Sequence, residues 1–146
     1  FTGEGNDSVD SQSFYSWTAL LPLMWTMEQF GADPWNGLCF GFPDGRPFRQ
    51  ENRLYDGARY TVCSDGEKTE LYRNGTLLFC SDLKTRFKHF EWKAHYGSVD
   101  VEAKETGTVR FCRESPRMVL ADGACLPEGT AEIAVSPGHH RIEIFW

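Results

Sequence analysis

The sequence lacks the marks of a membrane-spanning or exported protein. No apolar stretch approaches the roughly 20 residues that a helix needs to cross a bilayer. The longest such run, residues 19–25, is short and contains a proline. No Lys or Arg stands near the start of the chain, as it would in a signal peptide. We therefore expect no membrane partner.

A basic surface is also missing. The 146 residues carry a net charge of −6, and the densest basic run, residues 84–89, is short. Proteins that bind nucleic acid by its phosphates usually gather Lys and Arg on one face. We therefore expect no nucleic-acid partner.

Metal-binding and redox motifs are absent as well. The five cysteines are Cys39, Cys63, Cys80, Cys112 and Cys125, and no two form a C-x-x-C pair. Adjacent residues in a strand point to opposite faces, so His139-His140 does not predict a metal site. We expect no metal and no cofactor.

The odd number of cysteines leaves one thiol unpaired, which favours a reducing bacterial cytoplasm over secretion. Cysteines in strand-like segments are expected to act as buried, inert hydrophobes.

Motifs for catalysis are likewise missing. No serine has the G-x-S-x-G context of a nucleophile elbow. The acidic residues Glu4, Asp7 and Asp10 lie close together in a polar, Gly- and Ser-rich opening, which is typical of a solvated turn or a helix cap. Residues alone therefore predict no catalytic group.

What the sequence does contain is one helical segment followed by many short β-type runs. Apolar residues at helical spacing predict a helix over residues 13–30, which Pro22 should kink or restart. After Gly31 come short strand-like runs separated by turns, and Asn74-Gly75 gives the strongest hairpin signal. We predict a mainly β protein, an antiparallel two-sheet β-sandwich preceded by one N-terminal α-helix. Residues 1–31 form the loop and helix, and residues 32–146 the sandwich.

Three segments carry a resemblance to a known family. They are T-G-E-G at residues 2–5, F-Y-S-W-T-A-L-L at residues 14–21, and D-P-W-N-G-L-C-F-G at residues 33–41. These segments resemble the last helix, and the exit into a C-terminal β-domain, of (α/α)6-barrel glycosidases, namely family sixty-three glucosidases and trehalase-like enzymes. Residues 129–144 are similar to the closing strands of several glycosidase β-sandwiches.

The resemblance implies a role for the chain. The catalytic Glu and Asp of such enzymes precede the T-G loop and have no counterpart in this sequence. The chain is then a C-terminal accessory β-sandwich of a glycoside hydrolase, non-catalytic by itself, whose partner is the upstream (α/α)6 catalytic domain. Two alternatives remain open, an independent carbohydrate-binding module and a structural or assembly domain.

The carbohydrate-contact candidates are Trp17, Trp35 and Trp92. The resemblance places Trp17 toward the sugar pocket of a complete barrel, whereas the others are aromatic residues that could stack on an oligosaccharide. Core packing is the competing and favoured explanation for the aromatic residues of the β region. Without a barrel, the helix must cover one face of the sandwich or self-associate with a second copy.

Overall fold

The computed structural model describes residues 20–41 and 46–146. Within that part of the chain, a helix over residues 20–29 precedes thirteen strands. The strands are β1 (Phe30–Asp33), β2 (Gly37–Phe40), β3 (Phe48–Tyr55), β4 (Ala58–Ser64), β5 (Thr69–Arg73), β6 (Thr76–Ser81), β7 (Lys88–Trp92), β8 (Tyr96–Ala103), β9 (Gly107–Phe111), β10 (Met118–Ala121), β11 (Ala124–Cys125), β12 (Glu132–Val135) and β13 (Gly138–Phe145).

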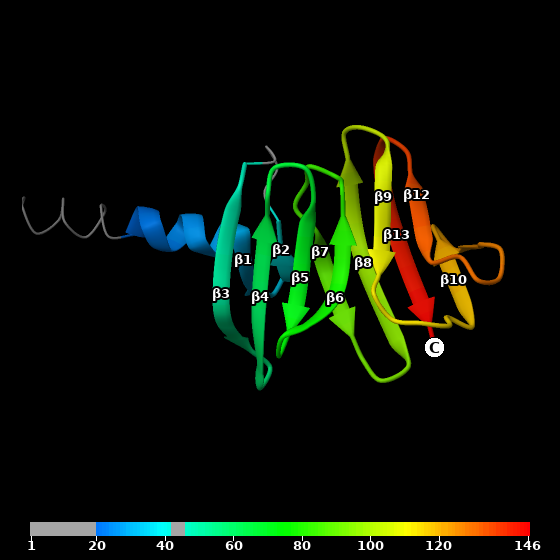
Figure 1. Cartoon of the computed structure of the whole chain (residues 1–146). Coiled ribbons are helices and arrows are strands. Elements are labelled where there is room, and N and C mark those ends of the chain that lie inside the picture. Colours follow the sequence, from blue (N-terminus) through cyan, green and yellow to red (C-terminus); the bar gives the residue numbers. More distant parts are fainter. Residues whose placement is uncertain (1–19, 42–45) are drawn as a thin grey trace, which may run out of the picture.

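The strands build two large antiparallel sheets. One has the order β12-β9-β6-β5-β4-β3 and the other the order β11-β10-β13-β8-β7, while β1 and β2 form a separate hairpin. The two large sheets face each other as the layers of a sandwich (Figure 1). The predicted fold class, a mainly β sandwich preceded by one helix, is confirmed.

The core lies between the two sheets and is rich in phenylalanine. Phe79 of β6 is fully buried, and its ring centroid lies 4.9 to 5.8 Å from those of four other phenylalanines. These partners are Phe40, Phe87, Phe90 and Phe111. Opposite them, alternate residues of β8 and β13 point inward, including Val99, Val101, Ile142 and Ile144.

The predicted hairpin at Asn74-Gly75 is confirmed. Arg73 pairs with Thr76, and the two turn residues have φ angles of 49° and 82°. A type I′ turn requires positive φ at both central positions, which Asn and Gly tolerate best. The Asn74 side chain also accepts a hydrogen bond of 3.0 Å from the backbone N–H of Arg59, which ties the turn to β4.

A second tight turn connects β1 to β2 inside the D-P-W-N-G segment. The Asp33 carboxylate accepts hydrogen bonds of 2.8 Å from the backbone N–H groups of Trp35 and Asn36. Gly37 has a φ of 61°, a conformation that glycine adopts without steric cost. Phe40 at the end of β2 then exchanges backbone hydrogen bonds with Phe87, just before β7. The hairpin is thereby joined to the five-stranded sheet.

The helix does not lie over either sheet. Figure 1 shows it (blue) extending away from the sandwich beside β1 and β3. Its large apolar side chains are 44 to 66% exposed. The expectation that the helix would cover one face of the sandwich is therefore wrong, because the junction at Gln29 and Gly31 fixes the helix in another direction. Residues 13–19, the first part of the predicted helix, lie outside the described residues.

Candidate functional site

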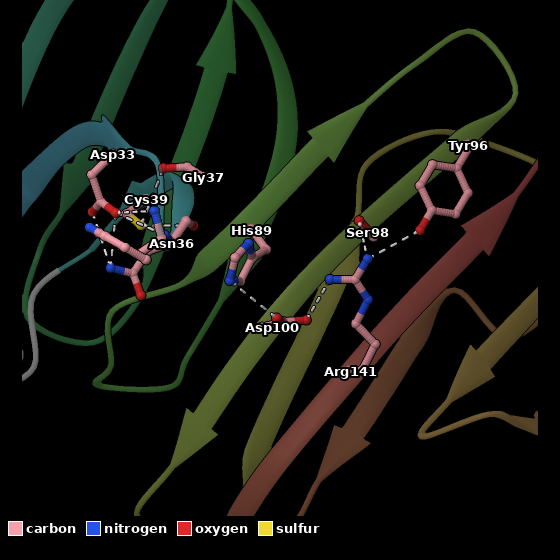
Figure 2. A network of polar contacts seen from close by, with 10 residues as sticks. Asp33, Asn36, Gly37, Cys39, His89, Tyr96, Ser98, Asp100 and Arg141 are labelled. Carbon is pink, nitrogen blue, oxygen red and sulfur yellow. Dashed lines mark hydrogen bonds and ion pairs between the residues drawn. The ribbon is translucent and has the colours of Figure 1, made fainter.

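The outer face of the five-stranded sheet carries a connected polar network. Register pairs Arg141 of β13 with Asp100 of β8, and the guanidinium donates a 2.7 Å hydrogen bond to the Asp100 carboxylate. The same guanidinium reaches Ser98 at 3.3 Å and the Tyr96 hydroxyl at 3.4 Å. Tyr96 in turn donates a 2.8 Å hydrogen bond to Glu143. Alternate residues of a strand point the same way. Tyr96, Ser98 and Asp100 of β8 therefore share the face on which Figure 2 shows Arg141.

His89 extends this network toward the β1–β2 turn. Its Nε2 lies 3.9 Å from an Asp100 oxygen, and its backbone N–H donates to the Asn36 carbonyl at 2.7 Å. The pairing of β7 with β8 shifts register between Lys88 and Glu91, and His89 has a φ of 49°. Such a bulge re-aims the bulged side chain, which here places the imidazole beside Asp100.

A second cluster continues the network at the other side of β13. The Asp122 carboxylate accepts one hydrogen bond of 2.8 Å from the Arg141 backbone N–H. Its second oxygen lies 2.8 Å from Nδ1 of His140. The backbone hydrogen bond, followed by the bond to His140, lowers the pKa of Asp122. Together the two clusters line an open depression of about 470 Å³, bounded by Asn36, Lys88, His89, Asp100, Asp122, His139, His140 and Arg141.

Both carboxylates that line this depression, those of Asp100 and Asp122, are engaged by neighbouring side chains. A glycosidase needs one carboxylic acid that stays protonated, which requires a raised pKa. Asp100 is engaged by Arg141, and the pKa of Asp122 is lowered. Other carboxyl groups of the described residues whose pKa shifts, Asp33, Asp65 and Glu70, also shift downward. No carboxyl group of the described residues whose pKa shifts is thus shifted upward, as the acid of a glycosidase would be.

A cleft of about 340 Å³ opens near the β1–β2 hairpin, between the ends of the two large sheets. Trp92 of β7 forms part of its wall with Tyr55 and Tyr60, and Arg73 and Glu91 contribute charge. The Arg73 guanidinium lies 6.0 Å from the Tyr60 ring centroid, and its Nε is buried without a hydrogen-bond partner. Aromatic rings beside hydrogen-bonding groups are the usual composition of a small-ligand site.

The three tryptophans predicted to contact sugar do not form a common site. Trp92 is partly buried, and its ring centroid lies 4.9 Å from that of Trp146, so it serves the core as well as the cleft. Trp35 lies in the β1–β2 turn, is 84% exposed and does not line the cleft. Trp17 lies outside the described residues. The competing explanation, core packing, accounts for most contacts of Trp92 but does not apply to the exposed Trp35.

The helix presents a continuous apolar surface. At about 100° per residue, Leu20, Leu23, Met24 and Met27 share one face, turned away from the buried Gln29. Leu23 and Met27 also line a groove of about 420 Å³ whose other wall is formed by residues 51–55 of β3. We name this the helix–β3 groove. Leu54, which is 76% exposed, extends its apolar lining.

The base of the helix is held to the sandwich. The Gln50 side chain donates a 2.6 Å hydrogen bond to the Gln29 side chain. The Gln29 backbone carbonyl also accepts a 3.0 Å hydrogen bond from the backbone N–H of Gly41. A Cβ added at Gly31 would lie 2.7 Å from the Met27 carbonyl oxygen, so only glycine allows this close approach. The exposed face is thus held in place by the junction and does not fold back.

In residues 20–41 and 46–146, no three His, Cys, Asp or Glu side chains are placed together to hold a metal ion. Across the same residues, no helix has the length and apolar character needed to cross a membrane.

Comparison with known proteins found no matching family model, no matching curated protein and no matching solved structure. The resemblance to (α/α)6-barrel glycosidases therefore stays a prediction.

Sequence reasoning missed the Arg141–Asp100 network. A signal was present, because polar residues at positions 96, 98 and 100, and again at 141 and 143, alternate with buried, mostly apolar ones. That pattern marks an outer sheet face. It does not reveal that the two strands are neighbours.

Proposed function

We propose that this chain is an accessory β-sandwich of a glycoside hydrolase, non-catalytic by itself, and that its helix and the helix–β3 groove pack against the helical catalytic domain. The observation that carries the proposal is the exposed apolar surface formed by the helix and Leu54. Apolar patches of this kind on an otherwise polar domain mark interaction sites.

The shape of this surface favours a helical partner. A helix with apolar residues on most of its circumference normally lies between other elements. Here Leu21 and Trp25 widen the stripe made by Leu23 and Met27 to well over a quarter of the helix. Neighbouring helices of a barrel would cover such a stripe on two sides by packing ridges into grooves.

The junction supports the same proposal. An accessory domain can support a barrel only if the connection is firm. The turn at Asp33 and the Phe40–Phe87 backbone pairing join the D-P-W-N-G-L-C-F-G segment to the sandwich core. That segment is also one of those that resemble the exit from the glycosidase barrel.

The first test is the size and activity of the native protein. An antibody raised against this chain is used for a denaturing immunoblot of source cells. We expect a band several times heavier than 16.7 kDa, and the immunopurified protein should hydrolyse glucosides or trehalose. A band at 16.7 kDa, or a larger protein with no glycosidase activity, would overturn the proposal.

The second test addresses the surface itself. In the native protein, Leu23→Lys with Met27→Lys should lower glycosidase activity and barrel stability, because charges would be buried against the partner. Met118→Lys is the matched control, since Met118 is 39% exposed on β10, in the sheet opposite the one that lines the groove. Equal losses of activity and stability in the two variants would contradict the proposed interface.

The cleft at Trp92 favours a second candidate, an independent carbohydrate-binding module. Titration of the chain with malto-, gluco- and manno-oligosaccharides should then change tryptophan fluorescence, and Trp92→Phe should reduce that change while Trp35→Phe should not. A flat titration to millimolar sugar would dismiss this candidate and leave the accessory role untouched.

A further inference from the structure

Two cysteines meet on the outer face of the six-stranded sheet. Cys80 lies on β6, and Cys112 directly follows β9. Their Sγ atoms are 3.8 Å apart, although 32 positions separate them in the sequence. The backbone holds this arrangement through the pairing of Cys80 with Arg110 and a 2.7 Å hydrogen bond from the Cys112 N–H to the Leu78 carbonyl. We name them the outer-sheet thiol pair.

The other cysteines have no thiol neighbour of this kind. Cys39 is fully buried, and its Sγ lies 3.3 Å from the Asn36 carbonyl oxygen. Cys63 lies on the same outer face as the pair, but its neighbour is the Glu70 carboxylate at 3.9 Å. Cys125 is exposed, and its Sγ lies 3.6 Å from a backbone carbonyl oxygen.

The pair is both reachable and polarised. Cys80 and Cys112 are half-buried, contrary to the expectation that strand cysteines would be buried and inert. The hydrogen bond from the Cys112 thiol, assisted by the Arg110 charge, lowers the pKa of Cys80 to about 7. The same hydrogen bond, together with burial, raises the pKa of Cys112. Arg110 pairs directly with Cys80 across the two strands, and its charge favours the thiolate there. This placement favours Cys80 as the thiol that reacts first and Cys112 as the one that reacts second.

We propose that Cys80 and Cys112 form a modification site, which a low-molecular-weight disulfide oxidises to a disulfide across strands β6 and β9. The Cys80 thiolate, having released its proton to solvent, attacks one sulfur of the oxidant. The oxidant's S–S bond breaks, and one thiolate leaves and takes up a proton. Cys112 then loses its proton and attacks the Cys80 sulfur, which releases the second thiol.

The reaction balances as a two-electron exchange. The protein loses two hydrogen atoms and gains one S–S bond, while the oxidant becomes two thiols. The Sγ atoms must approach from 3.8 Å to the bond length of about 2.05 Å. Cys80 pairs with Arg110, so Cys112 is its diagonal neighbour. Closing the bond therefore requires rotation of the two half-buried side chains together with a small approach of the β6 and β9 backbones.

The test uses the reduced chain and oxidised glutathione. We expect the intact protein to lose the mass of two hydrogen atoms, the thiol count in denaturant to fall by two, and peptide mapping to find Cys80 joined to Cys112. Cys63→Ser, the matched control on the same sheet face, should behave as the parent does. Cys112→Ser should stop at a glutathione adduct on Cys80.

Cys80→Ser should slow the loss of thiols by roughly fivefold or more, because the thiol that remains has the raised pKa. Circular dichroism of each serine variant checks that the fold is retained, and mapping of the unmutated chain is independent of the variants. An adduct confined to Cys125, or equal rates for Cys80→Ser and the parent, would overturn the proposal.

Discussion

Replacing Phe40 by alanine tests whether the junction between helix and sandwich belongs to the core. Phe40 is the last residue but one of the D-P-W-N-G-L-C-F-G segment and is fully buried. Its ring centroid lies 5.1 to 5.3 Å from those of Phe79, Phe87 and Phe90. Phe40→Ala removes the ring and leaves a cavity that these neighbours fill only in part.

The expected loss follows from that burial. Truncation of a buried phenylalanine to alanine costs about 3–5 kcal/mol. With a shift of roughly 2–4 °C per kcal/mol for a chain of this size, the melting temperature should fall by about 10 °C. Phe40→Leu, which keeps much of the volume, should cost less. Backbone pairing with Phe87 is unchanged in both variants, so any difference between them comes from the side chain.

Urea unfolding followed by far-ultraviolet circular dichroism measures this loss. With a slope of about 2 kcal/mol/M, a loss of 4 kcal/mol moves the midpoint by about 2 M. Trp35→Ala is the matched control from the same segment, because Trp35 is 84% exposed. It should change the free energy of unfolding by no more than about 0.5 kcal/mol. If Phe40→Ala costs no more than Trp35→Ala, the junction is not part of the core.

Other predictions concern single groups. Met24→Lys should change the free energy of unfolding of the isolated chain, measured by urea titration, by no more than about 0.5 kcal/mol relative to the parent, because Met24 is 58% exposed. Gly75→Ala should destabilise the chain by about 1–2 kcal/mol in the same assay, since Gly75 has a φ of 82°. Hydrogen bonds from a lysine ammonium and a tyrosine hydroxyl lower the pKa of Glu70 in the folded protein below the ordinary value of 4.5. The ionised Glu70 carboxylate therefore contributes its full stabilisation above pH 4.5, and this contribution is lost as the pH falls through the lowered pKa of the folded state. Glu70→Gln should accordingly flatten the decline in melting temperature below pH 4.5. The rate of Cys80 alkylation by iodoacetamide should rise with pH through a midpoint of about 7 and then level off, whereas in Cys112→Ser the midpoint should move upward.

The local elements of the fold were predictable because their signals lie within a few residues. Asn74-Gly75 requires only the turn chemistry of two positions, and the structure has the expected positive φ angles. The apolar periodicity predicts a helix over residues 13–30, and the described part of that segment is helical over residues 20–29, with Phe30 already in β1. The alternation of Val99 and Val101 with polar neighbours predicts a strand with one buried face.

The candidate sites were not predictable because each joins residues that are distant in sequence. Arg141 meets Asp100 across 41 positions, and Cys112 meets Cys80 across 32. Both contacts depend on which strands are neighbours and in what register, and a slip of one residue would turn every side chain to the other face. His89 adds a further difficulty, since its direction is set by a bulge that the sequence does not announce.

The helix carries the strongest argument about function, because its exposure and its attachment point in the same direction. An apolar helix on a flexible tether would fold back onto any apolar surface within reach. Here Gln29 is hydrogen-bonded to Gln50, and Gly31 allows the helix end to approach β1 closely, so the helix is held in a fixed direction. Leu23 and Met27 border β3 only across the helix–β3 groove and stay exposed. A structure that fixes an apolar face in contact with solvent leaves hydrophobic free energy unrealised, and only a partner on that face recovers it. The groove against β3 gives the proposed partner a second wall, which favours a folded helical domain over a sheet edge or a flat surface.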